Sequence, residues 1–241
     1  VPVSAALSAL VVKTGFYLLV RLWLDVFAGL GAEHVTTLLG ALGGAAVLWG
    51  GVQALQQERL KMMVAYSTVA QVGYLFMLFP LASISGALPG ALLLAASHAA
   101  SKAALFMCAG SVLAVYGHDR IQSLDGFGAR LPMTTVAFGL SSISLIGLPP
   151  SGGFAGKWML ISAALAGGAW WWAAIITLGG LLSAAYLFRV LAHAFLEPPA
   201  TGPGRVPRGM ELTSLILACI AIALNFAAVP LHDLLHAGGS R

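Results

Sequence analysis

The chain has 241 residues, of which 59% are hydrophobic and only 8% are charged, and its mean hydropathy is +0.93. Soluble domains carry about a quarter charged residues, so this composition excludes an ordinary soluble domain and predicts a membrane protein. The basic residues outnumber the acidic ones by 12 to 8, but they are scattered and form no patch, which argues against nucleic-acid binding. Two cysteines are too few to indicate a disulfide framework or a metal site.

Seven or eight apolar segments follow one another along the chain, and most reach the roughly 20 residues that span a bilayer as a helix. They cover residues 3–23, 35–55, 62–83, 89–116, 132–148, 152–166, 169–193 and 211–229. Because lipid forces each backbone amide to find its partner within a helix, we expect an all-α, polytopic transmembrane bundle that forms one domain over residues 1–241. The first segment contains Lys13 and lacks a cleavage site, so it is no signal peptide, and a chain starting at Val1 suggests missing upstream residues.

Polar stretches rich in helix breakers separate the segments. The loops expected from them are residues 25–34, 56–59, 116–131 and the Pro/Gly-rich linker 197–210. If the spans alternate, Arg59, Lys61, Arg120 and Arg130 fall on one side of the membrane, which the positive-inside rule assigns to the cytoplasm.

The linker cations suggest a discontinuous helix. Arg205 and Arg208 join the positive side only if residues 152–193 cross the membrane once, as a broken helix. The sequence therefore predicts a break near Gly167–Gly168.

Helix breakers also precede two membrane lysines. Pro2 lies shortly before Lys13, and a run of breakers lies shortly before Lys157. The run consists of Pro149, Pro150, Gly152 and Gly153. Interrupted helices in matching positions of two halves are typical of a transporter's ion site, although ordinary kinks would leave the same trace.

Lys13 stands near the middle of its segment, about 15 Å of helix from either end, so its ammonium group reaches the membrane surface poorly. Burial disfavours the charged form of an amine, which makes proton exchange easier than at a surface lysine. Tyr17, one turn further along, is placed to hold Lys13 or a water molecule. The alternative is a structural lysine paired with a carboxylate elsewhere.

His98 and Lys102 are four residues apart in an apolar helix and share one face, as do the hydroxyl residues Ser97 and Ser101. Two basic groups this close disfavour each other's protonation, and the hydroxyls can order bridging water. A lone membrane histidine is often a core residue bonded to a backbone carbonyl. A histidine one turn from a lysine instead indicates proton transfer.

The other two lysines differ in context. Lys157 follows the strongest run of breakers, where a broken helix exposes carbonyls that can line a cavity. Lys61 lies beside Glu58 and Arg59 at the start of a helix, where a solvated side chain explains it equally well as a transport role.

All eight acidic residues fall in expected loops or at helix ends. A dedicated Na⁺ or K⁺ site usually employs buried oxygen ligands such as carboxylates. The buried basic residues therefore favour protons over metal cations. Nothing in the sequence indicates a redox cofactor.

Four motifs in the correct order resemble the antiporter-like proton-conducting subunits of respiratory complex I, membrane-bound hydrogenases and Mrp-type cation/proton antiporters. The segments that carry the resemblance are PVSAALSALVVKTGFYLLVR, QERLKMMVAYSTVAQVGY, SHAASKAALFMCAGSV and LIGLPPSGGFAGKWMLI. They place Lys13, Lys61, the His98/Lys102 pair and Lys157 on the family's lysine and histidine positions.

The resemblance implies an inverted-repeat fold with discontinuous helices and a water-wired row of lysines and histidines. It also implies a longer subunit of roughly fourteen helices, of which this chain is the C-terminal part. Two departures stand out. The first six helices, with the glutamate that pairs with the first lysine, are absent, and Gln71 stands where many members have histidine.

The sequence therefore predicts a proton-translocating subunit in a prokaryotic cytoplasmic membrane. It would work with other membrane subunits, including homologous antiporter-like ones, and any redox chemistry would belong to those partners. Lys13, His98, Lys102 and Lys157 would pass the protons. The alternatives are a Na⁺(K⁺)/H⁺ antiporter component and a non-conducting structural subunit, with a quinone-reducing enzyme as the weakest.

Overall fold

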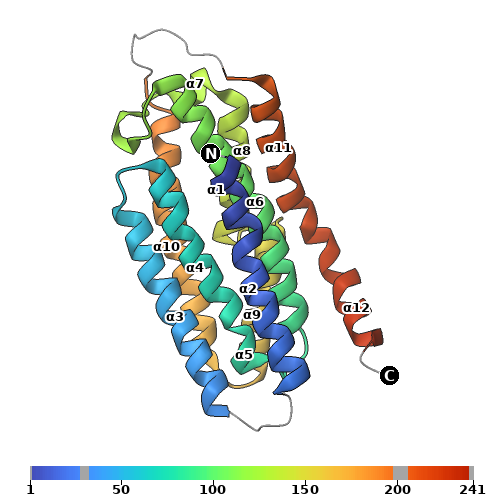
Figure 1. Cartoon of the computed structure of the whole chain (residues 1–241). Coiled ribbons are helices and arrows are strands. Elements are labelled where there is room, and N and C mark those ends of the chain that lie inside the picture. Colours follow the sequence, from blue (N-terminus) through green and yellow to red (C-terminus); the bar gives the residue numbers. More distant parts are fainter. Residues whose placement is uncertain (1, 28–32, 198–205, 239–241) are drawn as a thin grey trace.

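The computed structural model describes residues 2–27, 33–197 and 206–238. Figure 1 shows a bundle of long helices. Among the described residues, the regular elements are all helical, and the only β pairing is an isolated antiparallel bridge between Arg59 and Arg120. The predicted all-α transmembrane bundle is confirmed. The expected loop residues 28–32 and 198–205 lie outside the described part.

The first three crossings come from the N-terminal third of the chain. The first comprises α1 (Pro2–Ala6), the π-helical segment η1 (Leu7–Val11), α2 (Val12–Arg21) and a second π-helical segment, η2 (Leu22–Val26). The second is α3 (Glu33–Gln56), and the third is α4 (Leu60–Phe76) followed by the short α5 (Leu78–Leu81). Each is long and apolar enough to cross a membrane.

The remaining crossings surround α6 (Ala87–Tyr116), the longest helix, with 30 residues. After a loop with η3 (Ile121–Ser123) and α7 (Phe127–Arg130) come two half-length helices, α8 (Pro132–Ile146) and α9 (Gly152–Ala166). The chain then forms α10 (Trp170–Ala194), and ends in α11 (Arg208–Ala223), η4 (Leu224–Ala227) and α12 (Ala228–Gly238). The described residues thus make seven crossings, within the predicted seven or eight.

The discontinuous helix is the pair α8 and α9, and the expected break near Gly167–Gly168 is wrong. Those two glycines form a tight turn, in which the Gly168 amide donates to the Leu165 carbonyl (3.1 Å) and Gly168 has φ +70°. The turn reverses the chain, so α9 and α10 run in opposite directions (Figure 1). The 15 residues of α8 span about 22 Å, too short for a crossing alone, and α9 completes it.

Moving the break leaves the predicted charge asymmetry intact. Residues 132–166 cross once and α10 crosses back, so α11 starts at the end of the bundle that carries the loop with α7 (Figure 1). Arg208 therefore reaches the same end as Arg59 and Arg120. The number of crossings before it is the one that the distribution of charges predicted.

Backbone hydrogen bonds join the loops at this positively charged end. The Leu60 amide donates to the Asp119 carbonyl (2.7 Å), and the Ile121 amide donates to the Glu58 carbonyl (2.8 Å). The guanidinium group of Arg189, near the end of α10, donates to the carbonyls of Leu55 and Gln57. These bonds fix α3, α4, α6 and α10 relative to one another at one end.

The core lies around α6, which contacts α1, α4, α8, α9 and α11. By contrast, the first crossing and α3 expose many large apolar side chains, such as Leu10 (66% exposed) and Leu38 (58% exposed). Most of the buried polar side chains lie on α4, α6, α8, α9 and α10.

Candidate functional site

Lys102 on α6 is fully buried and bonds to the facing α4. Its ammonium nitrogen donates to the Val64 carbonyl (2.6 Å) and to the Ser67 hydroxyl. Ser67 itself donates to the Val64 carbonyl (3.0 Å). The amine is held by neutral oxygens, and no Asp or Glu is among the buried residues of the described chain.

Lys13 binds the backbone of Ser8, and the hydroxyl group of Ser8 leads through Thr68 to the same carbonyl. The Lys13 amine donates to the Ser8 carbonyl, and the Ser8 hydroxyl lies 2.9 Å from the Thr68 hydroxyl. Thr68 donates to the Val64 carbonyl at 3.3 Å. A line of hydrogen-bonding groups thus runs from Lys13 on the first crossing to Lys102 on α6.

Lys13 lies two residues after the π-helical segment η1, in which Ser8 supplies the carbonyl that it binds. Single π-helical turns within α-helices are frequent at functional sites. Lys13 is half-buried, while Tyr17 is 54% exposed and makes no hydrogen bond to Lys13 among the described residues. The supporting role expected for Tyr17 is therefore not seen.

His98 is 1% exposed, and neither ring nitrogen has a hydrogen-bond partner in the described part of the chain. Its ring lies within electrostatic range of Lys13, Lys102 and Lys157. His98 is therefore not the alternative considered above, a core histidine bonded to a backbone carbonyl.

The two serines beside His98 and Lys102 differ from the expected arrangement. The Ser97 hydroxyl lies 2.7 Å from the Ser144 hydroxyl on α8 and donates to the Ala221 carbonyl (3.4 Å) on α11. The Ser101 hydroxyl is buried and has no partner among the described residues. Ser97 therefore joins α6 to α8 and α11, and does not bridge His98 to Lys102.

Lys157 lies at the break between α8 and α9. Its amine donates to the carbonyls of Leu145 (2.8 Å) and Ile146 (3.1 Å), the last residues of α8, and lies 4.2 Å from the centre of the Tyr74 ring. A cation is favoured at the C-terminal end of a helix, where carbonyls lack partners. Gly147, with φ +89°, leaves room for the Lys157 stem, because a Cβ there would lie 2.8 Å from its Cδ.

The predicted breakers form this joint. Pro149 and Pro150 lie in the connection, and Ser151 caps α9 by accepting a hydrogen bond from the Phe154 amide (3.1 Å). Gly152 and Gly153 open α9. At Gly153 a Cβ would lie 1.8 Å from the Ser144 carbonyl oxygen, so only glycine lets the two half-helices approach this closely.

Lys61 lies apart from these groups. It is exposed in the first turn of α4, and its backbone amide donates to the Asp119 carboxylate at 3.4 Å. This position matches the alternative of a solvated lysine at a helix start.

Several buried polar side chains beside the lysines were not predicted from the sequence. Those on α4 are Ser67, Thr68 and Tyr74, and those on α10 are Ser183 and Tyr186; Gln71, also on α4, was noted only as a departure from the family. Residues 67, 71 and 74 are spaced by four and three, so a polar stripe along one helical face was available as a signal.

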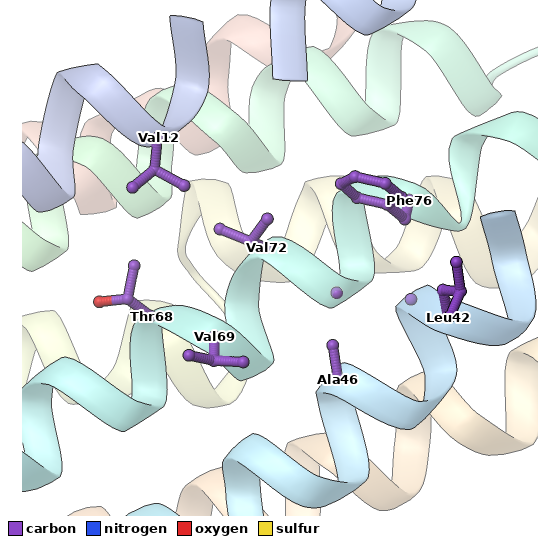
Figure 2. Close-up of a pocket in the computed structure, with 9 residues that line it drawn as sticks. Val12, Leu42, Ala46, Thr68, Val69, Val72 and Phe76 are labelled. Carbon is purple, nitrogen blue, oxygen red and sulfur yellow. The ribbon is translucent and has the colours of Figure 1, made fainter. Parts of the chain in front are cut away.

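An apolar pocket of about 400 Å³ opens near Lys13 between α2, α3 and α4. Figure 2 shows Val12, Leu42, Val69 and Phe76 around it, with Thr68 as a polar wall residue. No charged side chain lines this pocket, so its chemistry suits hydrocarbon and not an ion.

Comparison with known proteins places the chain in a family. Residues 1–183 match the family model described as NADH:quinone oxidoreductase/Mrp antiporter, TM. NADH-quinone oxidoreductase subunit N of Desulforudis audaxviator is 37% identical over 231 residues, which are 92% of this chain and 46% of that protein. F(420)H(2) dehydrogenase subunit N of Methanosarcina mazei is 30% identical over 239 residues, 95% of this chain and 48% of that protein.

The fold matches as well. A chain of the Mrp complex from Dietzia sp. DQ12-45-1b superposes with a TM-score of 0.84 at 24% identity, covering 96% of this chain and 52% of that chain. The present chain thus spans about half the length of these relatives. It is an integral membrane protein that belongs to the NADH:quinone oxidoreductase/Mrp antiporter transmembrane family.

Proposed function

We propose that this chain is the proton-conducting part of an antiporter-like membrane subunit. The observation that carries this proposal is a cluster of four basic side chains between apolar helices. Lys13, Lys102 and Lys157 are held by neutral oxygens, and His98 is buried near them without a hydrogen-bond partner among the described residues. Charged groups at this depth cost from roughly 3 kcal/mol upward, so a set of them indicates a transport path.

The arrangement suits stepwise proton transfer. Each amine can take up a proton and release it, and His98 lies where the charges of three lysines act on it. A proton arriving at one site raises the energy of protonating its neighbours, which favours transfer onward.

The relatives support a place in a larger assembly. Their names are those of a quinone oxidoreductase subunit and an F(420)H(2) dehydrogenase subunit, and the similar fold comes from an Mrp complex. We infer that residues 1–241 form one transmembrane domain within a longer subunit, which works beside other membrane subunits of such a complex.

The test is replacement of Lys13 or Lys157 by Ala in the full-length subunit within its complex. Proton uptake into inside-out membrane vesicles is followed by quenching of an acridine dye. We expect each variant to slow proton uptake about ten-fold or more while the complex still assembles on a native gel. The control is Leu165→Ala, an exposed residue of the same helix as Lys157.

Normal proton uptake in both lysine variants would support the alternative of a structural subunit and overturn the proposal. A Na⁺/H⁺ or K⁺/H⁺ exchanger is a second candidate, because the family includes Mrp antiporters. Addition of NaCl or KCl to energised vesicles separates the two, since only an exchanger releases the dye quench in response to the cation.

A further inference from the structure

Among the described residues no hydrogen bond joins Lys102 directly to Lys157, and two side chains of α10, Ser183 and Tyr186, lie in the gap between their hydrogen-bond partners. We propose that the Tyr186 hydroxyl, held by Ser183, relays protons between Lys102 and Lys157. This inference rests on the proposed function and names the missing intermediate step.

Tyr186 contacts the Lys102 side of the gap. It is fully buried, and its hydroxyl donates to the Ser183 hydroxyl at 3.1 Å. The same hydroxyl lies close enough to the side chain of Ser67 to act on it electrostatically, and Ser67 accepts a hydrogen bond from the Lys102 amine. One hydroxyl therefore separates Tyr186 from Lys102.

Gln71 joins this group to the Lys157 side. Its amide nitrogen lies 3.5 Å from the Ser183 hydroxyl and donates to the Leu145 carbonyl at 3.0 Å. That carbonyl is also an acceptor for the Lys157 amine. The two lysines are thus joined through Ser67, Tyr186, Ser183 and Gln71.

Tyr74 brings a second hydroxyl to the same place. Its ring lies against the Lys157 amine, and a Cβ at Gly179 would lie 2.4 Å from its hydroxyl oxygen. The Tyr74 hydroxyl and the Gln71 carbonyl oxygen are both buried without a hydrogen-bond partner among the described residues. Buried polar atoms of this kind are rare and call for an explanation, and a proton path supplies one.

Chemistry favours the tyrosine over the glutamine as the relay. A side-chain amide has no proton that exchanges readily at neutral pH, whereas a hydroxyl oxygen both accepts and donates. When the Tyr186 oxygen accepts a proton from the Lys102 side, its own O–H proton passes to the Ser183 hydroxyl, which accepts from it. The Ser183 proton, which otherwise rests on the Gly179 carbonyl, then passes to a water molecule held by the buried Tyr74 hydroxyl and Gln71 carbonyl oxygen, and that water protonates the neutral Lys157 amine. Tyr186 begins and ends neutral, and one positive charge has moved.

The decisive variant is Tyr186→Phe in the full-length subunit within its complex, because it removes the hydroxyl and keeps the ring that fills the core. We expect proton uptake into vesicles to slow about ten-fold, with normal assembly and a larger solvent deuterium isotope effect. Tyr66→Phe is the matched control. Tyr66 is half-buried on α4 and packs its ring against Trp49 with centroids 6.0 Å apart, outside the gap.

A second-site change separates a relay from a purely structural hydroxyl. Adding Gln71→His to Tyr186→Phe places an imidazole, which exchanges protons near neutral pH, beside Ser183 and Leu145. Recovery of proton uptake supports the relay. Persistence of the slow rate in the double variant would mean that the hydroxyl only holds α10 in place, and would overturn the inference.

Other outcomes are equally informative. Uptake by Tyr186→Phe within two-fold of the parent, while Lys157→Ala abolishes it, overturns the relay and leaves the proposed function standing. Normal uptake in both lysine and tyrosine variants overturns the proposed function itself. If Tyr186→Phe fails to assemble, Ser183→Ala carries the same test, because it removes the partner that orients Tyr186.

Discussion

At the scale of single residues, the buried lysines are notable for what holds them. Lys102 and Lys157 bind backbone carbonyls, and no carboxylate is among the buried side chains of the described chain. An ion pair would fix the charge on each amine, since removal of the proton would leave its partner buried and uncompensated. Neutral acceptors leave both charge states accessible.

Lys102→Met tests this at one residue. The Val64 carbonyl keeps the hydroxyls of Ser67 (3.0 Å) and Thr68 (3.3 Å) as donors, and the Ser67 hydroxyl keeps its own bond to that carbonyl, so neither group is left without a hydrogen bond. We expect thermal stability of the detergent-solubilised complex to be unchanged or slightly higher, while proton uptake is lost. Leu93→Met, another buried site on α6, is the control for packing. A variant that unfolds at much lower temperature, or still takes up protons, would contradict this account.

Much of the site could be predicted from single residues, because a lysine in the middle of an apolar segment needs a reason to be there. Lys13, His98, Lys102 and Lys157 stood out in this way. Ser8, Thr68 and Tyr186 did not, because hydroxyl residues are common in membrane helices and only packing reveals which of them face a lysine. For Lys61 the motif and the position pointed different ways, since the motif suggested a role and the helix start suggested the exposed side chain that the structure has.

At the scale of elements, the joint between α8 and α9 depends on close approach of two helix ends. The sequence predicted a helix break at Pro149, Pro150, Gly152 and Gly153, where the joint lies, and a second one at Gly167–Gly168, where the chain turns back instead. Both sites carry paired glycines next to apolar helices. Whether such a pair makes a break or a reversing turn depends on the direction of the next helix, which is set by tertiary packing and is not encoded in local spacing.

Gly153→Ala tests the joint. The added Cβ would meet the Ser144 carbonyl oxygen at 1.8 Å, and overpacking of this kind costs about 1–3 kcal/mol. We expect a lower unfolding temperature for the solubilised complex. Gly139→Ala is the matched control on α8, where a Cβ meets nothing within 4 Å and alanine favours the helix by about 1 kcal/mol. Equal stability of the two variants would show that the joint tolerates separation.

At the scale of the whole molecule, charge and topology agree. The basic residues Arg59, Arg120 and Arg130 gather in the loops at one end of the bundle, and α11 begins with Arg208 at that end. The sequence predicted this asymmetry because counting charges between spans needs no knowledge of packing. It could not predict which helix faces are covered by other helices. The first crossing and α3 are largely exposed, although their sequences are as apolar as those of the buried helices.

Accessibility to a membrane-impermeant maleimide tests the topology. Arg120 and Ser83 are exposed and lie at opposite ends of the 30-residue helix α6. In a Cys219→Ala background, we expect Arg120→Cys to be labelled only in inside-out vesicles and Ser83→Cys only in intact cells. The remaining native cysteine, Cys108, is buried. Labelling of both positions from the same side would refute the seven-crossing arrangement.

The two carbonyls that bind Lys157 have a consequence for how the joint behaves during turnover. A charged amine carries three hydrogens, and Leu145 and Ile146 use two of them. A neutral amine retains two, enough to satisfy both acceptors. In the proposed transfer the third hydrogen is the one that departs, so both carbonyls keep a donor in either charge state of the amine.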